Sequence, residues 1–202
     1  VSPDGRLTAF VVNRDGNQNL YLMNNDSARM IPLTRKKDGT VYYQPIWNKK
    51  GNLIAVDYTA QDYGRNIQVM DSTGKVLKEL DFAHDVRQPC FDDSGEYLYY
   101  SSDKTGIFNI YRQHLNTGAE ELVTNVRGGA FYPHVQGDTL VYAEYSGIKI
   151  RLKMVIGPKP LDQKLAYYKN YEIPRLRELQ EKDYLTNSQK YGNDFEHIFI
   201  VP

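Results

Sequence analysis

The residues of this sequence that could do chemistry are few and stand far apart. The single cysteine, Cys90, has no second cysteine to pair with, and we interpret it as a small buried hydrophobe. The chain contains no Gly-x-Ser-x-Gly, His-Glu-x-x-His, Cys-x-x-Cys or glycine-rich phosphate loop. The histidines lack the spacing of a metal site; they are His84, His114, His134 and His197. We therefore expect no catalytic residue, no metal site and no cofactor in this segment.

Two further patterns have both a functional and a structural interpretation. The run NRDGN, residues 13–17, is similar to a calcium-binding loop, but the later bidentate glutamate is absent and a turn accounts for it. The aromatic residues Tyr99, Tyr100, Phe108 and Tyr111 could stack on sugars or bases. Packing between sheets is the alternative that we favour for them.

The charges of the chain are balanced, with 25 Lys and Arg against 25 Asp and Glu. A nucleic-acid-binding face requires clustered Lys and Arg, and the short runs Arg35–Lys37 and Lys49–Lys50 fit solvated loops better. No apolar stretch approaches the about 18 residues that a membrane-spanning helix needs. The sequence therefore predicts neither a nucleic-acid partner nor direct membrane insertion by this segment.

A repeat with a period of 44 residues must position the functional residues of the chain. Its copies begin at Gln44, Gln88 and Tyr132, each followed by a proline. An incomplete copy, which lacks the first residues of the repeat, opens the chain as VSPDGRLTAFVV. In the second unit the runs PIWN, LIAVDYT, NIQVMD and VLKELDF, separated by turn residues, predict four short strands. Such periods are typical of β-propeller blades, because a lone blade cannot bury both faces and must stack on neighbours.

We expect an all-β fold, a β-propeller fragment of about three to four four-stranded antiparallel blades with a mixed C-terminal tail. Val1 aligns with Trp47 inside a strand, so we expect the chain to begin within a blade and further blades to complete the ring. The expected propeller, residues 1–156, divides into a partial blade 1–43, blades 44–87 and 88–131, and a partial blade 132–156.

Residues 157–202 have a different pattern from the repeat. We expect a linker there, followed by a short helix from Pro174 to Leu185, in which Glu178 stands four residues before Lys182. The apolar run from Phe195 to Pro202 is expected to form a strand. This segment either closes the propeller or leads out of it.

The turn motifs resemble those of the TolB-like, WD-repeat-like branch of β-propellers. They are the SPDG of Ser2–Gly5 and the Gly-x-x-Asn-Leu of Gly16–Leu20, with echoes in the next two units. The resemblance covers residues 1–155, and the same branch includes propellers of prolyl-oligopeptidase-type peptidases and of envelope proteins. The motif residues are turn formers, so the resemblance implies architecture and carries over no functional residue.

Propeller geometry indicates where a partner would contact the chain. Turns between the second and third strands lie on one rim with the connections between blades, and loops on a rigid scaffold can vary freely. Tyr and Arg favour interfaces, and the start of each inner strand faces the axial channel. The candidate contact residues are Tyr43, Gln44, Tyr63, Arg65, Arg87, Gln88, Asp103, Tyr132 and His134. For Gln44 and Gln88, hydrogen bonding between blades is the alternative interpretation.

The sequence predicts a non-catalytic binding or scaffold module that holds a protein or peptide. The resemblance implies a place in the periplasm or cell envelope of a bacterium. The alternative is the substrate-gating propeller of a prolyl-oligopeptidase-like serine peptidase, whose catalytic domain would follow Pro202. In that family the propeller restricts access of the substrate.

Overall fold

The computed structural model describes residues 1–60, 64–80 and 84–166, and their secondary structure is four β-sheets and one 3-10 helix. The first sheet contains β1 (Leu7–Arg14), β2 (Asn17–Asn24) and β3 (Met30–Pro32). The second sheet contains β4 (Val41–Tyr42), β5 (Ile46–Trp47), β6 (Leu53–Thr59), β7 (Asn66–Asp71) and β8 (Val76–Leu80). The third sheet contains β9 (Val86–Phe91), β10 (Tyr97–Ser102), β11 (Asn109–His114) and β12 (Glu120–Leu122). The fourth sheet contains β13 (Ala130–Gln136), β14 (Thr139–Ser146) and β15 (Lys149–Ile156), and the helix η1 spans Gln163–Ala166.

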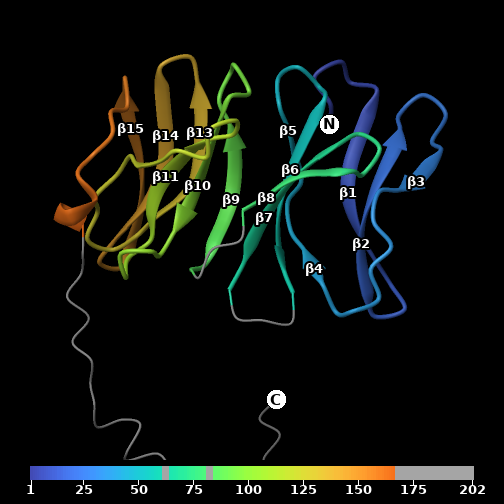
Figure 1. Cartoon of the computed structure of the whole chain (residues 1–202), viewed down its shortest axis with the longest axis horizontal. Helices are drawn as coiled ribbons and strands as arrows, with labels where there is room; N and C mark the ends of the chain where they lie inside the picture. Colours follow the sequence, from blue (N-terminus) through green and yellow to red (C-terminus); the bar gives the residue numbers. More distant parts are fainter. Residues whose placement is uncertain (61–63, 81–83, 167–202) are drawn as a thin grey trace, which may run out of the picture. The chain divides into compact units, whose positions relative to one another are not determined.

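Each sheet is antiparallel, and strands that follow in sequence lie side by side, except that β4 and β5 both pair with β6. Figure 1 shows the sheets succeeding one another in chain order, from β1–β3 to β13–β15. This arrangement confirms the predicted all-β propeller fragment. The helix and the strand predicted between Pro174 and Pro202 lie outside the described residues.

The inner strands differ from the prediction in where they begin. The repeat copies begin at Gln88 and Tyr132, with the inner strand expected from the following proline, but β9 starts at Val86 and β13 at Ala130. The pairing of β9 with β10, and of β13 with β14, shifts register close to the predicted starting residues. A β-bulge inserts an extra residue and bends the strand. Each inner strand therefore continues past a bulge that interrupts its sequence pattern.

A side-chain hydrogen bond builds the hairpin that follows the inner strand in the second and third sheets. The amide of Leu53 donates to Asn48 Oδ1 at 3.0 Å, and the amide of Tyr97 donates to Asp92 Oδ1 at 3.0 Å. Gly95 closes the third-sheet turn with φ of 73°, a left-handed conformation that glycine adopts without steric cost. The repeated turn residues are therefore structural, as their chemistry indicates.

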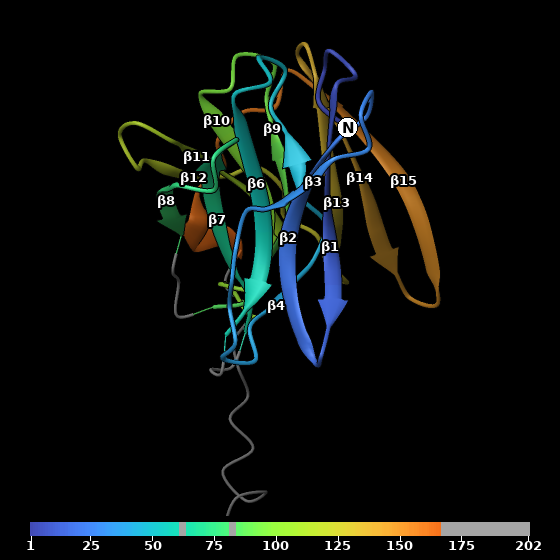
Figure 2. The same ribbon diagram turned by 90° about the vertical axis from the view of Figure 1, so that its right-hand side faces the viewer.

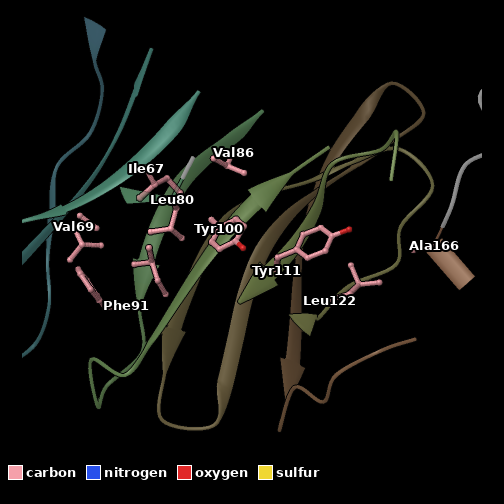
Figure 3. Packing of buried hydrophobic residues seen from close by; sticks show 11 residues of the cluster. Ile67, Val69, Leu80, Val86, Phe91, Tyr100, Tyr111, Leu122 and Ala166 are labelled. Atoms are coloured by element: carbon pink, nitrogen blue, oxygen red, sulfur yellow. The ribbon is translucent and has the colours of Figure 1, made fainter. Parts of the chain in front are cut away.

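Neighbouring sheets pack against each other through clusters of apolar side chains. The cluster between the second and third sheets includes Ile67 and Val69 on one side and Tyr100 and Tyr111 on the other (Figure 3). Cys90 is buried in the cluster between the third and fourth sheets, as expected for a small hydrophobe. Because both inner sheets are covered on two faces, they form a rigid base for the loops at their ends.

Candidate functional site

The loops at the start of β9 meet the turns after β6 and β10 on one rim. The amide of Val86 donates to the carbonyl of Arg65 at 2.9 Å. The amide of Asp85 donates to Asp103 Oδ1 at 3.0 Å, and the amide of Asp103 donates to the carbonyl of Asp85 at 3.3 Å. These bonds join three loops that are separated in sequence. We call the set Tyr43, Asp57, Arg65, Asp85, Arg87, Asp103 and Phe108 the rim cluster.

Arg65 occupies one half of the rim cluster. Its Nη1 donates to Asp57 Oδ2 at 3.0 Å, and its guanidinium lies 3.6 Å from the centre of the Tyr43 ring. An arginine over an aromatic face is attracted by the negative face of the ring. The side chain remains 25% exposed, so one of its faces stays accessible to a partner.

Asp57 is buried in the middle of β6 beneath Arg65. Burial raises the pKa of its carboxyl group, because desolvation penalises the charged form, while the Arg65 guanidinium and the amide of Gln88 act in the opposite direction. The carboxylate therefore links the second sheet to the third. Sequence reasoning missed this residue, although a charged residue within the apolar run LIAVDYT was a signal for it.

Arg87 occupies the other half of the rim cluster. It forms an ion pair with Asp85, and its guanidinium lies 4.4 Å from the centre of the Phe108 ring. The Phe108 ring in turn packs against Phe131 of the fourth sheet with the ring centres 5.0 Å apart. Phe108 thus packs between sheets, as expected for it, and also supports the rim, while Tyr99, Tyr100 and Tyr111 are buried.

Gln88 and Tyr132 hold equivalent positions at the bulges of β9 and β13. Both have left-handed backbones, with φ of 59° and 53°. Gln88 Oε1 accepts the amide of Tyr132 at 2.9 Å and the hydroxyl of Ser101 at 3.2 Å, so Gln88 does join neighbouring sheets. Tyr132 itself is 61% exposed. A non-glycine residue in this conformation is strained and is frequently found at functional sites.

The remaining candidate contact residues are Gln44, Tyr63 and His134. Gln44 is exposed, and Tyr63 lies outside the described residues. His134 lies farther along β13, on an open pocket of about 490 Å³ that the inner strands enclose with the N-terminal residues. Equivalent repeat positions line that pocket, namely Ile46, Cys90 and His134 and, one residue later, Trp47, Phe91 and Val135.

The inner-strand pocket includes one thiol, that of Cys90. Burial raises the pKa of the Cys90 thiol, which disfavours the nucleophilic thiolate. In the described part of the chain no group of three or more His, Cys, Asp or Glu side chains could hold a metal ion. Nor does any helix among those residues have the length and apolar character to cross a membrane.

Solved structures show what this geometry is similar to. No protein-family model and no curated protein sequence matches the chain. A TolB of Agrobacterium tumefaciens superposes with a TM-score of 0.69 at 22% identity, covering 79% of this chain and 61% of that one. The fold is that of a TolB-like β-propeller. TolB of Acinetobacter baumannii gives a TM-score of 0.65 at 18% identity, covering 79% of this chain and 40% of that one.

A propeller of this kind also occurs in an enzyme. A prolyl endopeptidase superposes with a TM-score of 0.55 at 18% identity, covering 81% of this chain and 27% of that one. The chain thus spans less than two thirds of each of these three proteins. At such identities the similarity establishes the TolB-like fold, and no residue of these proteins is transferred to this chain.

Proposed function

We propose that this chain is a non-catalytic binding module whose rim cluster and Tyr132 hold a protein or peptide. The observation that carries the proposal is the presentation of Tyr132, which is 61% exposed while its strained backbone is fixed by Gln88. A rigid exposed aromatic residue loses little conformational entropy on binding. Tyrosine and arginine also dominate the energetics of protein interfaces.

The charges of the rim favour a polar peptide partner. Arg65 and Arg87 are each 25% exposed and each rests on an aromatic ring. Their orientation is therefore set before binding, although both already have a carboxylate partner. A carbonyl or carboxylate of a peptide can accept from their remaining N–H groups without reorganisation of the rim. The similarity to TolB supports a location in the bacterial cell envelope for this module.

Selection from a displayed peptide library tests the proposal. The chain is immobilised, peptides are selected, and their dissociation constants are measured for Tyr132→Ala and Arg87→Ala. We expect binding to weaken at least about fivefold in each variant, because interface anchors of these types contribute more than about 1 kcal/mol. Met30→Ala is the control, because Met30 is 57% exposed on the first sheet, outside the rim cluster. Selected peptides that bind all the variants equally would overturn the rim as the binding site.

A second candidate function is the substrate-gating propeller of a serine peptidase. The similarity to the prolyl endopeptidase favours it. In that case the reading frame beyond Pro202 encodes a Gly-x-Ser-x-Gly motif, and the full protein reacts with a fluorophosphonate probe. A parent reading frame without the motif excludes this candidate.

A further inference from the structure

The fourth sheet has an open edge within the described residues. β15 pairs with β14 along its whole length, from Lys149 opposite Ser146 to Ile156 opposite Thr139. The other side of β15 carries no strand in the described part of the chain, as Figures 1 and 2 show. An edge of this length presents a row of backbone donors and acceptors to which another strand can pair.

The residues that follow β15 cover a different edge. The amide of Leu161 donates to the carbonyl of Leu122 at 2.8 Å, which places this stretch beside β12 of the third sheet. Ala166 is buried in the same cluster as Leu122 and Tyr111. Residues 161–166 therefore lie against the third sheet and do not pair with β15.

The two faces of β15 have opposite chemistry. One face carries aliphatic side chains that are 65–78% exposed, namely Ile150, Leu152, Met154 and Ile156. The other face carries three cations, Lys149, Arg151 and Lys153. Lys153 Nζ lies 3.5 Å from Glu144 Oε2 on β14. Lys149 and Arg151 have no acidic side chain within 4 Å among the described residues.

In the second and third sheets, the outermost strand contributes a glutamate that binds a tyrosine of the same sheet. In the second sheet Tyr58 Oη donates to Glu79 of β8. In the third sheet Tyr100 Oη donates to Glu120 Oε1 of β12 at 2.7 Å, and Lys104 Nζ pairs with the same carboxylate. In both sheets, a glutamate on the outermost strand accepts the hydroxyl of a tyrosine two strands further in.

The fourth sheet contains the tyrosine of the third sheet at the equivalent position, without the glutamate. Tyr142 stands five residues after the turn glycine Gly137, as Tyr100 stands five residues after Gly95. It pairs with Lys153, so its side chain is on the cationic face of the sheet. No hydrogen-bond partner of Tyr142 Oη exists in the ranges that the structure describes.

We propose that β15 accepts a fourth strand from another protein, an extended segment in which acidic residues alternate with aliphatic residues. The main chain of the segment pairs with the open edge of β15. Its acidic side chains lie beside Lys149, Arg151 and Tyr142, and its aliphatic side chains extend the apolar face of Leu152 and Met154. Main-chain bonds supply affinity in this mode of recognition, while alternate side chains supply specificity.

A synthetic ten-residue peptide of alternating glutamate and valine, labelled with a fluorophore, tests the proposal by anisotropy. We expect the double variant Lys149→Glu/Arg151→Glu to weaken binding by at least about tenfold, since two charge pairs are replaced by repulsion. The matched control is the double variant Arg35→Glu/Lys37→Glu, whose cations are exposed in the loop after β3 and stand two residues apart, like those of β15. A peptide with lysine in place of each glutamate should bind the charge-reversed variant better than the wild type.

Hydrogen exchange then distinguishes strand addition from contact with side chains alone. The amides of β15 that point away from β14 should exchange more slowly when the glutamate–valine peptide is bound. Unchanged exchange in β15, or equal affinity of all variants for the peptide, would overturn the proposal. Self-association through β15 that excludes the peptide would also overturn it, because the occupant would then be a second copy of the chain.

Discussion

The third and fourth sheets arise from the same repeat, but they differ in which of their faces and edges pack against another strand or sheet. The third sheet has four strands, and its two faces pack into separate apolar clusters. The described fourth sheet has three strands, and only the face with Leu140 and Tyr142 packs against a neighbour. The repeat therefore specifies hairpins and strand pairs. Whether a strand belongs to the core or to a surface depends on whether another strand or sheet lies against it.

The test with the largest expected effect truncates one leucine in each of the two sheets. Leu98 in β10 is fully buried, and Leu152 in β15 is 78% exposed. We expect Leu98→Ala to lower the free energy of unfolding by about 2–5 kcal/mol, because it leaves a cavity. We expect Leu152→Ala to change it by no more than about 0.5 kcal/mol. Urea denaturation measures both, and a large loss in Leu152→Ala would show that β15 is covered.

The second test removes one hydroxyl from each sheet. Tyr100→Phe deletes the hydrogen bond to the Glu120 carboxylate, and we expect a loss of about 1.5–3 kcal/mol, the range for bonds to charged groups. Tyr142→Phe should leave the unfolding free energy almost unchanged. If the glutamate–valine peptide binds β15 as proposed, Tyr142→Phe should instead weaken peptide binding. Equal losses of stability in the two variants would contradict the difference between the sheets.

The third test compares the turn glycines that follow the inner strands β9 and β13. Gly95 and Gly137 have φ of 73° and 58°, so alanine is strained at either position, and we expect each substitution to cost about 1–2 kcal/mol. A Cβ at Gly95 would also lie 3.2 Å from Asn48 Nδ2, whereas at Gly137 it meets nothing within 4 Å. Gly95→Ala should therefore be the less stable variant in thermal unfolding. The opposite order would show that Asn48 does not constrain this turn.

The smallest expected effect is a change of the free energy of unfolding with pH, which arises from Asp57 in the rim cluster. Asp57 stands six residues after Gly51, and Ser101 takes the equivalent place in the third sheet. The pKa of Asp57 is raised in the folded state by burial, so the folded protein binds the proton more tightly than the unfolded chain. Its contribution to stability is present below the unfolded pKa, about 4, and is lost as the pH rises through the folded pKa.

Unfolding experiments at a series of pH values measure this effect. The free energy of unfolding of the wild type should fall relative to that of Asp57→Asn as the pH is raised from about 4 to 7. Ser101→Ala serves as the control, since a serine does not titrate in this range and its difference from the wild type should not depend on pH. A constant difference between Asp57→Asn and the wild type would contradict the raised pKa.

Much of the fold could be predicted because its signals are local. The predicted runs LIAVDYT and NIQVMD coincide with β6 and β7, since turn formers a few residues apart delimit them. Of the nine candidate contact residues, Tyr43, Arg65, Arg87 and Asp103 belong to the rim cluster, and Gln88 and Tyr132 contact each other. Whether they bind a partner stays a prediction. Asp57 and Asp85 were missed because their roles depend on residues that reach them only in the folded chain.

The sequence by itself determined the repeat, the hairpins and the apolar alternation of the strands, because each rests on side chains and backbone within a few residues. Only the tertiary structure decided that Gln88 and Tyr132 take left-handed backbones and that Gln88 holds a tyrosine 44 residues away. Only the structure showed that Leu161 pairs with Leu122 beside β12, and that no described strand pairs with the outer side of β15. These features depend on contacts between distant segments, and such contacts have no signature in the local pattern of residues.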